Sequence, residues 1–594
     1  MKCDICEIGC SIPEGFQGLC GQYINQLGEI REVHSDRYLV VCPISIETMP
    51  MLHYYPGGKF LQISTTGCNF DCPGCISNVI VKEMNPDSAA LCYLSAEQVV
   101  GKAVENQCLG IAFLMNDPLA SFQSFLRVAI AAKEHNLLVG CSTNGYFTEA
   151  SLQKIMPYLD FVNMGFKGFN NEAYRRCGAP SVQPVLRNIK QLAEKKVHVE
   201  VSCMFNKYGR DEVIKLAQKL SEISEGIPFQ IMRYIPLEQA DPELEPSIRE
   251  AEKLWQELKG ILEHVYLFNS PGTEGLNSYC PSCGKIIYRR DFYGPMGAKL
   301  RNMPEKMHEG GNCSYCGKDL SLYGAFRRDL YQEGPFQGGY PFTRALEMVE
   351  AMLVAMGVKD KEKVVKVWEN ILVNNKLENL ERDIQRLPSY LDTLIYCGEI
   401  ADCRKEAQQL TSYIETRLQL IQKSLVKAER RPRAYYAMGK PRFAIKGERI
   451  ENQLIEAAGG HSVNRDIEIK GRPGMSISVE QLNTLNPEVI FISGFISSSV
   501  ADFNSFCREE RVNVSAVRNG RIYVHPAPGW DFGSPRWILG LMYISSVLHP
   551  DLCQFDITAE AREFYQRFYG QDFKTDAINR SFGKPNIYWQ WGKV

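Results

Sequence analysis

Between residues 60 and 270, short apolar runs alternate with segments in which apolar residues recur every three or four positions. Short apolar runs are typical of buried strands, and the wider spacing is typical of amphipathic helices. Strands are predicted over residues 61–65, 109–115, 137–143, 160–164, 197–203, 229–234 and 264–268. Helices are predicted to begin near residues 95, 121, 148, 209 and 246. Repeated strand–helix units predict an α/β fold with a parallel sheet, either a barrel or a doubly wound sheet.

The pattern changes twice further along the chain. Helical periodicity dominates residues 345–356, 361–373 and 402–429. From residue 431 strands return at 431–438, 489–493 and 517–524, with helices at 451–458 and 478–485. We therefore expect five parts: a cysteine-rich segment, a first α/β domain, a cysteine knuckle module, a helical linker and a second α/β lobe. Their predicted limits are 1–58, 59–275, 276–325, 326–430 and 431–594.

Composition narrows the class of protein. The 594 residues are 45% hydrophobic and 23% charged, as expected for several globular domains. A net charge of −2 does not suggest a nucleic-acid partner. No apolar run reaches the roughly 18 residues of a membrane span, and the N-terminus lacks a signal-peptide pattern. These features predict a cytoplasmic protein without a membrane partner.

The cysteines are numerous and clustered. There are 21 of them, and many fall into three tight groups. An odd total with local clusters favours metal ligation in a reducing compartment over a disulfide framework. The groups are Cys3, Cys6, Cys10 and Cys20; then Cys68, Cys72 and Cys75; then Cys280, Cys283, Cys313 and Cys316.

The central group has Cys-x₃-Cys-x₂-Cys spacing and follows the first predicted strand. Three thiolates can hold three irons of a 4Fe–4S cluster, which leaves the fourth iron for a non-protein ligand. A zinc knuckle with a borrowed fourth ligand is the alternative. The spacing resembles the signature of radical S-adenosylmethionine (SAM) enzymes, in which SAM fills the open iron. The resemblance implies that Cys68, Cys72 and Cys75 are the catalytic cluster ligands.

Polar residues follow several strands at the edge where parallel sheets place their ligands. For any one of them alone, a turn or a cap is a commoner role than ligand contact. Together they can hold the polar groups of SAM, so we predict that they bind this cofactor. The set comprises Asn116, Asp117, Thr143, Asn144, Lys167 and Arg233.

The two outer cysteine groups predict further metal sites. The N-terminal four thiols suit zinc or a second Fe–S cluster, and their spacing does not decide between these; some can also be free thiols. The pairs Cys280-x₂-Cys283 and Cys313-x₂-Cys316 predict one tetrahedral Cys₄ site for zinc or a rubredoxin-like iron. We expect this second site to be structural.

Residues 1–325 resemble the pyruvate formate-lyase activating enzyme-like branch of the radical SAM family, and AmmeMemoRadiSam-type members in particular. The matching motifs are residues 115–118 (MNDP), 143–146 (TNGY), 166–169 (FKGF) and 279–284 (YCPSCG). The resemblance implies a partial (β/α)₆ barrel. Four residues, Gly74, Asp117, Gly165 and Ile235, are smaller or less charged than is usual in that family. These departures suit either a larger pocket or a diverged site that has lost radical chemistry.

Residues 405–570 resemble the C-terminal lobe of class III periplasmic binding proteins for cobalamin, haem and ferric siderophores. The matches are 457–460 (AAGG), 485–490 (LNPEVI), 519–523 (NGRIY) and 548–550 (LHP). The helix predicted at 402–429 suits the long inter-lobe helix of that family. Trp530, in a proline- and glycine-rich loop, can either stack on a flat macrocycle or belong to the core.

Together the resemblances imply an enzyme that reductively cleaves SAM at a 4Fe–4S cluster and abstracts hydrogen from a substrate through a 5′-deoxyadenosyl radical. Such an enzyme needs a low-potential electron donor such as flavodoxin or ferredoxin. We expect a small-molecule or protein substrate. The candidates are a tetrapyrrole or a metal chelate held by the C-terminal lobe. Two alternatives remain open: an activase of glycyl-radical enzymes, and a non-catalytic Fe–S or metal-chelate binding protein.

Overall fold

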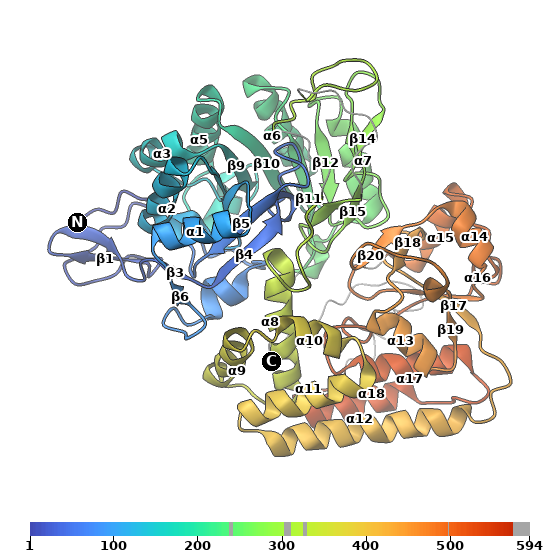
Figure 1. Ribbon diagram of the computed structural model, residues 1–594. Coiled ribbons are helices and arrows are strands. Elements are labelled where there is room, and N and C mark those ends of the chain that lie inside the picture. The colour runs from blue at the N-terminus through green and yellow to red at the C-terminus, as the bar shows by residue number, and fades with distance from the viewer. Residues whose placement is uncertain (237–240, 302–310, 325–329, 497, 574–594) are drawn as a thin grey trace.

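The computed structural model describes residues 1–236, 241–301, 311–324, 330–496 and 498–573 (Figure 1). The predicted knuckle module, linker and C-terminal lobe therefore each lie partly outside the described residues. No described helix is both long and apolar enough to cross a membrane.

An eight-stranded sheet forms the first α/β unit. Its spatial order is β12-β11-β10-β9-β8-β7-β5-β4, and all neighbours are parallel except β4 and β5. Because the parallel strands follow one another in chain order, the sheet has no reversal of the kind that defines a doubly wound sheet. The prediction of a barrel-type sheet is confirmed, and each predicted strand appears with ends shifted by at most two residues. The strands are β4 Val40–Ser45, β5 Lys59–Ser64, β7 Gly110–Phe113, β8 Leu138–Thr143, β9 Phe161–Phe166, β10 His198–Phe205, β11 Phe229–Arg233 and β12 Val265–Phe268.

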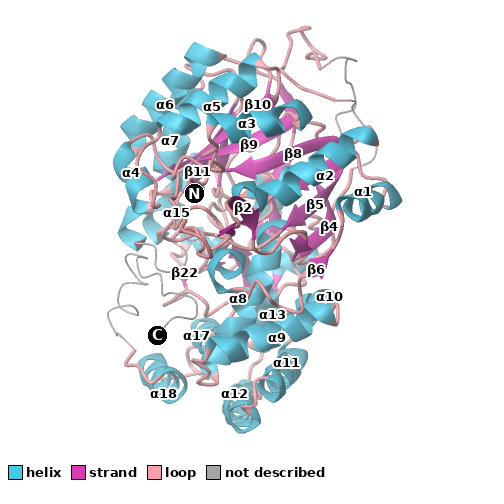
Figure 2. Cartoon of the chain, turned by 90° about the vertical axis from the view of Figure 1, so that its left-hand side faces the viewer, coloured by secondary structure: helices cyan, strands magenta, loops and turns pink. Residues whose placement is uncertain are grey.

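Helices connect these strands and pack against the strands that flank them (Figure 2). The predicted capping box at Ser95 is present, and a second one forms at Ser247. Two helices between β9 and β10 were not predicted; the second begins at a proline and buries Val185, Ile189 and Leu192. The helices are α1 Ala96–Glu105, α2 Phe122–Glu134, α3 Glu149–Ile155, α4 Asn171–Arg176, α5 Gln183–Glu194, α6 Arg210–Ile223 and α7 Ile248–Leu258.

Small hairpins frame this unit at both ends. The N-terminal segment contains β1 Tyr23–Gln26, β2 Glu29–Glu32 and β3 Arg37–Tyr38, which pairs with β6 Cys92–Tyr93. After β12 the chain forms two antiparallel hairpins; the first carries Cys280 and Cys283, and Cys313 and Cys316 lie in a separate turn closed by the Asn312–Asp319 bridge. The strands of the two hairpins are β13 Ser278–Tyr279, β14 Ile286–Tyr288, β15 Arg290–Phe292 and β16 Ala298–Leu300.

Five helices then lead to the C-terminal lobe, at the lower right of Figure 1. They are α8 Gly339–Ala355, α9 Lys361–Val373, α10 Leu377–Ile384, α11 Leu387–Ile400 and α12 Arg404–Leu425. The lobe has a mixed sheet of order β20-β18-β17-β21-β22, with β19 beside β17. Its strands are β17 Arg433–Ala437, β18 Phe443–Ile445, β19 His461–Ser462, β20 Gly474–Ser476, β21 Val489–Ile492 and β22 Ile522–Val524. Its helices are α13 Ile450–Ala457, α14 Val479–Leu485, α15 Val500–Glu509, α16 Ser515–Arg518, α17 Trp537–Leu548 and α18 Ile557–Tyr569.

The C-terminal lobe packs directly on the barrel. Lys440 pairs with Glu252 of α7 at 3.1 Å, and Arg249 of α7 pairs with Glu509 at 2.8 Å. One hydrophobic core contains Phe268 of β12, most of α8 and α17 of the lobe. The two α/β units therefore share a core through α8.

A buried ion pair joins the β15–β16 hairpin to the segment between β4 and β5. Nε of Arg290 donates to Glu47 at 2.7 Å, and both side chains are almost fully buried. The other Glu47 oxygen accepts from the Leu300 amide at 2.9 Å. Removing one partner of a buried pair leaves an uncompensated charge, which costs about 3–5 kcal/mol.

We expect Arg290→Met to lower the free energy of unfolding by about 3–5 kcal/mol, because it strands the Glu47 carboxylate. Urea unfolding followed by circular dichroism measures the change. The matched control is Arg289→Met, since Arg289 is the exposed neighbour and should stay within about 0.5 kcal/mol. Equal stability of the two variants would contradict the prediction.

The buried Glu347 on α8 should make the stability of the folded protein depend on pH. Burial raises its pKa to about 7, although Arg344 lies 3.1 Å away and acts in the opposite direction. A carboxyl whose folded pKa exceeds its unfolded value adds stability that is complete below about pH 4.5 and is lost as pH rises through about 7. We expect stability to fall between about pH 5 and 8, and Glu347→Gln to flatten this part of the curve. The exposed Glu362→Gln should leave the slope of thermal unfolding against pH unchanged.

Candidate active site

The loop after β5 carries Cys68, Cys72 and Cys75, and Asn116 fastens its start. Nδ2 of Asn116 donates to the carbonyls of Thr66 and Gly67 at 3.3 and 3.1 Å, and its Oδ1 accepts from the Thr65 amide at 3.0 Å. The amide of Asp71 donates to the Cys177 carbonyl at 3.0 Å. The loop is thus held at both its start and its centre.

Two glycines allow the loop to turn. Gly67 has a φ of 80°, and a Cβ there would lie 2.3 Å from Nε2 of Gln22. Gly74 has a φ of 67°, in the left-handed region that favours glycine. Gly74, one of the four departures from the family pattern, thus stands where the backbone favours glycine.

The three thiols of this loop are half-buried and lie beside one cation. Burial raises the pKa of Cys68 and Cys75, so neither thiol would ionise readily on its own. Burial also opposes the charge of the Lys167 ammonium, but the surrounding sulfurs, Cys72 foremost, raise its pKa. A bound metal ion deprotonates its thiol ligands outright. Three clustered thiols next to a lysine therefore fit an iron–sulfur cluster.

The predicted residues at the ends of β7 and β8 form one hydrogen-bonded network with the loop. Asp117 accepts from the Thr143 hydroxyl at 3.1 Å and from the Asn144 amide at 2.6 Å. Nδ2 of Asn144 donates to Oδ1 of Asn69 at 2.7 Å. The structure thus brings these residues together around the cysteines, where they position the loop.

Arg233 is at the carboxyl end of β11, but the described contacts do not join it to the cysteine loop. Its guanidinium donates to Glu245 at 2.7 Å and to the carbonyls of Pro246 and Asn269 at 2.9 Å. Its Nη2 is buried and has no hydrogen-bond partner among the described residues. A role in cofactor binding stays a prediction for this residue.

Cys177, which follows α4, is not among the predicted site residues. Its buried thiol contacts the Cys72 thiol, and the hydrogen bond from Cys72 together with Lys167 lowers its pKa. Phe70 of the loop packs edge-on against Tyr146 and Tyr174, which brings α4 to the loop. Cys177 belongs to no short sequence motif. Only a prediction of the helix before it could have indicated that it lies close to the cysteine loop.

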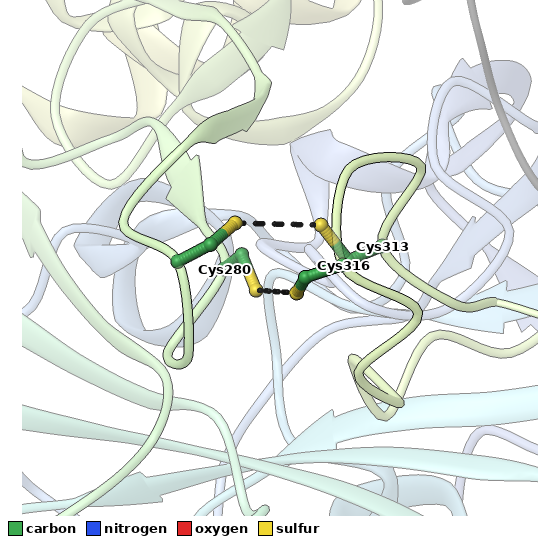
Figure 3. A group of neighbouring side chains, drawn as sticks. Cys280, Cys313 and Cys316 are labelled. Atoms are coloured by element: carbon green, nitrogen blue, oxygen red, sulfur yellow. Dashed lines mark hydrogen bonds between the residues drawn. The ribbon is translucent and has the colours of Figure 1, made fainter.

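The four knuckle cysteines form a compact site between the turn of the β13–β14 hairpin and the separate turn at residues 312–319 (Figure 3). All four sulfurs lie within 4.8 Å of one another, and Cys280–Cys316 and Cys283–Cys313 are 3.6 and 3.7 Å apart. Four thiolates about 2.3 Å from a zinc would be about 3.8 Å apart. The predicted Cys₄ site is therefore present, and its geometry suits a single tetrahedral ion.

The N-terminal cysteines lie next to the central loop. Cys3, Cys6, Cys10 and Cys20 line one pocket together with Asn69 and Leu119 of the barrel. The segment is fastened to the barrel: Tyr23 donates its hydroxyl to the Leu119 carbonyl at 2.6 Å, and Ser151 donates to that of Ile5 at 2.7 Å. Burial raises the pKa of Cys3 to about 11 and that of Cys6 to about 12.

In the C-terminal lobe, Trp530 belongs to the core. It is fully buried, and its indole lies 5.7 Å from the Phe573 ring. Phe532, two residues on, is only partly buried, and Arg449 and Arg344 lie over its ring at 4.3 and 5.9 Å. The aromatic side chain of this loop that remains partly exposed is thus Phe532.

Comparison with known proteins matches both units. Residues 63–220 match the Radical SAM superfamily model, and residues 373–528 match the Periplasmic binding protein model. A curated relative, the uncharacterized protein MJ0808 of Methanocaldococcus jannaschii, is 27% identical over 329 residues, which span 54% of this chain and 95% of that protein.

Solved structures similar to part of the chain include a periplasmic solute-binding protein from Veillonella parvula and an ABC transporter solute-binding protein from Sulfurospirillum deleyianum. The first is 20% identical with a TM-score of 0.31, and the match spans 35% of this chain and 66% of that protein. The second is 21% identical with a TM-score of 0.30, over 35% of this chain and 68% of that protein. At such scores, the assignment of the lobe depends on the family model.

Both predicted resemblances are confirmed, although the second match begins at the end of α9, earlier than the predicted residue 405. The radical SAM family implies a 4Fe–4S cluster and SAM as cofactors. The chain therefore contains one segment that matches the Radical SAM superfamily and another that matches the periplasmic binding proteins, and the first of these supports its assignment as a radical SAM enzyme.

Proposed function

We propose that this protein binds SAM at a cluster held by Cys68, Cys72 and Cys75 and uses it to abstract hydrogen from a substrate. The observation that carries the proposal is the three-thiol loop at the carboxyl end of β5, within a radical SAM domain. Cys68, Cys72 and Cys75 would hold a cluster there, which in its reduced state would supply the electron for cleavage of SAM to methionine and a 5′-deoxyadenosyl radical. A low-potential donor of the flavodoxin or ferredoxin class would deliver that electron.

The residues of the chain have distinct parts in this proposal. The three cysteines bind the irons, and Asn116 and Asp117 hold the loop and the end of β8 in place. Thr143 and Asn144, which bond to Asp117 and Asn69, are assigned to the cofactor side of the site. Lys167 offsets the negative charge that bound thiolates bring into a half-buried site.

The direct test is anaerobic reconstitution with iron and sulfide, followed by dithionite and SAM. We expect 5′-deoxyadenosine, measured by liquid chromatography and mass spectrometry. A chain with its full iron content that forms no 5′-deoxyadenosine would contradict the proposal.

A non-catalytic iron–sulfur protein is the second candidate, favoured by the contact of Cys177 with Cys72. If Cys177 were a permanent fourth ligand, no iron would be open to SAM. Under the leading proposal, Cys177→Ala keeps its iron and cleaves SAM as the parent does. If Cys177 is instead a permanent fourth ligand, only its removal opens an iron to SAM. SAM should then alter the electron paramagnetic resonance spectrum of the cluster in Cys177→Ala and not in the parent chain.

We also propose that the C-terminal lobe recognises the substrate, and that this is a corrinoid, a haem or another metal chelate. Phe532 and Phe495 lie near two guanidiniums, those of Arg344 and Arg449. Partly exposed rings suit stacking on a flat ligand, and carboxylates on that ligand would compete with Glu347 and Glu451 for the two arginines. Because Arg344 is on α8, the helix next to the barrel would take part in binding.

Titration with hydroxocobalamin and with haemin, followed by visible absorbance, tests this assignment. We expect one of them to bind and Phe532→Ala to weaken binding about tenfold, or about 1.4 kcal/mol. Tyr208→Ala, which removes an exposed ring of the barrel, should not change the affinity. No spectral change with either chelate in the parent chain would remove the proposal for the lobe and leave that for the barrel intact.

A further inference from the structure

The N-terminal cysteine group meets around one pocket, yet its sulfurs are not arranged for a single ion. Among the described residues, Cys280, Cys283, Cys313 and Cys316 are the one group of Cys, His, Asp or Glu side chains close enough to share an ion. Cys3, Cys6, Cys10 and Cys20 do not form such a group, although all four line the pocket. A mononuclear zinc site needs four sulfurs about 3.8 Å apart, so this arrangement does not suit it.

The central loop provides a comparison within the same chain. Cys68, Cys72 and Cys75 also fail to form a single-ion group, and they belong to a domain whose family implies a 4Fe–4S cluster. In such a cluster each iron takes its own thiolate, so the ligating sulfurs are further apart than around one ion. A 2Fe–2S cluster instead places two thiolates on each iron, but no hydrogen-bonding contact joins any two of the N-terminal thiols among the described residues.

The lining of the pocket suits a cluster shielded from water. Besides the cysteines it contains Ile5, Ile8, Ile12, Leu19, Tyr23 and Leu119. An apolar shell around a cluster controls solvent access and so its reduction potential.

Asn69 provides a second, independent observation. It lines the pocket, is 7% exposed, and its buried Nδ2 has no hydrogen-bond partner among the described residues. Its Oδ1 accepts from Asn144, which fixes the orientation of the amide. An orphaned N–H donor at a site rich in sulfur fits the hydrogen bonds that cluster sulfurs accept from surrounding protein.

We propose that Cys3, Cys6, Cys10 and Cys20 ligate a second 4Fe–4S cluster, and that Asn69 donates a hydrogen bond to it. Four cysteine ligands leave no iron open, so this site is suited to electron transfer and not to SAM binding. Asn69 directly follows Cys68 in the chain, which places the second site beside the first. Its use in electron delivery depends on the proposed function, whereas the presence of the cluster does not.

The test uses the full chain with Cys68, Cys72 and Cys75 changed to alanine, which leaves the N-terminal group intact. After anaerobic reconstitution we expect about four irons per chain, beyond at most about one in the knuckle. Dithionite should produce a paramagnetic signal that SAM does not alter. Adding Cys6→Ala and Cys20→Ala should remove those irons.

Three results would overturn the inference: no iron beyond the knuckle, about two irons with a 2Fe–2S spectrum, or zinc that disappears with the N-terminal cysteines. If the triple variant is misfolded by circular dichroism, the parent should hold about eight cluster irons and the variant with all four N-terminal cysteines replaced about four. Because iron is counted directly, a chain that holds these irons without cleaving SAM would contradict only the proposed function.

The role of Asn69 is tested by redox titration in the same triple variant. We expect Asn69→Leu to lower the midpoint potential of the N-terminal cluster, because hydrogen bonds to the sulfurs favour the reduced, more negative state. Asn519→Leu is the matched control, since it makes the same substitution at an exposed position of the C-terminal lobe and leaves Asn69 and its partner Asn144 in place. Equal potentials in the Asn69 variant and its parent would exclude that hydrogen bond.

Discussion

Replacing Cys72 with alanine is expected to lower 5′-deoxyadenosine formation at least about 10³-fold, or about 4 kcal/mol of transition-state stabilisation. The reason is that three thiolates must hold three irons for the fourth to stay open, and no other group of the loop can substitute for a sulfur. Cys177 contacts Cys72 but lies on a separate element. The reaction is measured with dithionite as the electron source, so that no partner protein limits the rate.

The matched control for this variant is Cys92→Ala, because Cys92 is exposed and lies outside the three cysteine groups. It should keep both the iron content and the rate of the parent. If the Cys72→Ala chain retains more than about a tenth of the parental rate, either Cys72 is not a cluster ligand or Cys177 replaces it. Rescue by Cys177 would then be examined with the Cys72→Ala, Cys177→Ala double variant, in which activity should disappear.

Replacing Cys313 with serine is expected to remove the metal ion of the knuckle and to lower the free energy of unfolding by at least about 4 kcal/mol. Cys313 is fully buried, in a small core that includes Ile287, Leu300 and Leu322. A short hairpin and a turn of eight residues cannot bury enough apolar surface to hold each other in place, so the ion supplies much of their stability.

Mass spectrometry of the metal content and thermal unfolding together check this prediction. Ser282→Ala is the control, since Ser282 is exposed between Cys280 and Cys283 and its loss should change neither quantity. Cobalt substitution would show the visible bands of a tetrahedral thiolate site in the parent and not in Cys313→Ser. A variant that loses the ion and keeps its melting temperature would show that the knuckle is not structural.

Structural elements and sites that depend on short stretches of sequence could be predicted. Contacts between residues far apart in the sequence could not. The barrel strands follow local apolar runs, and the knuckle follows from two Cys-x₂-Cys pairs. The Glu47–Arg290 pair joins residues 243 positions apart, so no local pattern indicates it. Trp530 and Phe532 share one loop, and only packing decides which ring is buried.

The hydrogen bonds between residues at the strand ends show the same limit of sequence-based prediction. The order of strands predicts that Asn116, Asp117, Thr143 and Asn144 meet at one edge, and they do. Their hydrogen bonds to each other and to the cysteine loop depend on side-chain directions that strand order does not determine. Arg233 lies at the same edge, but its guanidinium donates a hydrogen bond to Glu245, which is in the connection between β11 and α7.

Helix α8 is buried on nearly every side, including its charged residues Arg344, Glu347 and Glu350. A helix of this kind belongs to the interior of a larger body and not to a tether between independent modules. Gene fragments that stop before residue 339 would expose the flank of the barrel that α8 covers, and fragments that start after it would uncover the lobe. Production of either half by itself should yield aggregates, and the two activities would have to be studied in the intact polypeptide.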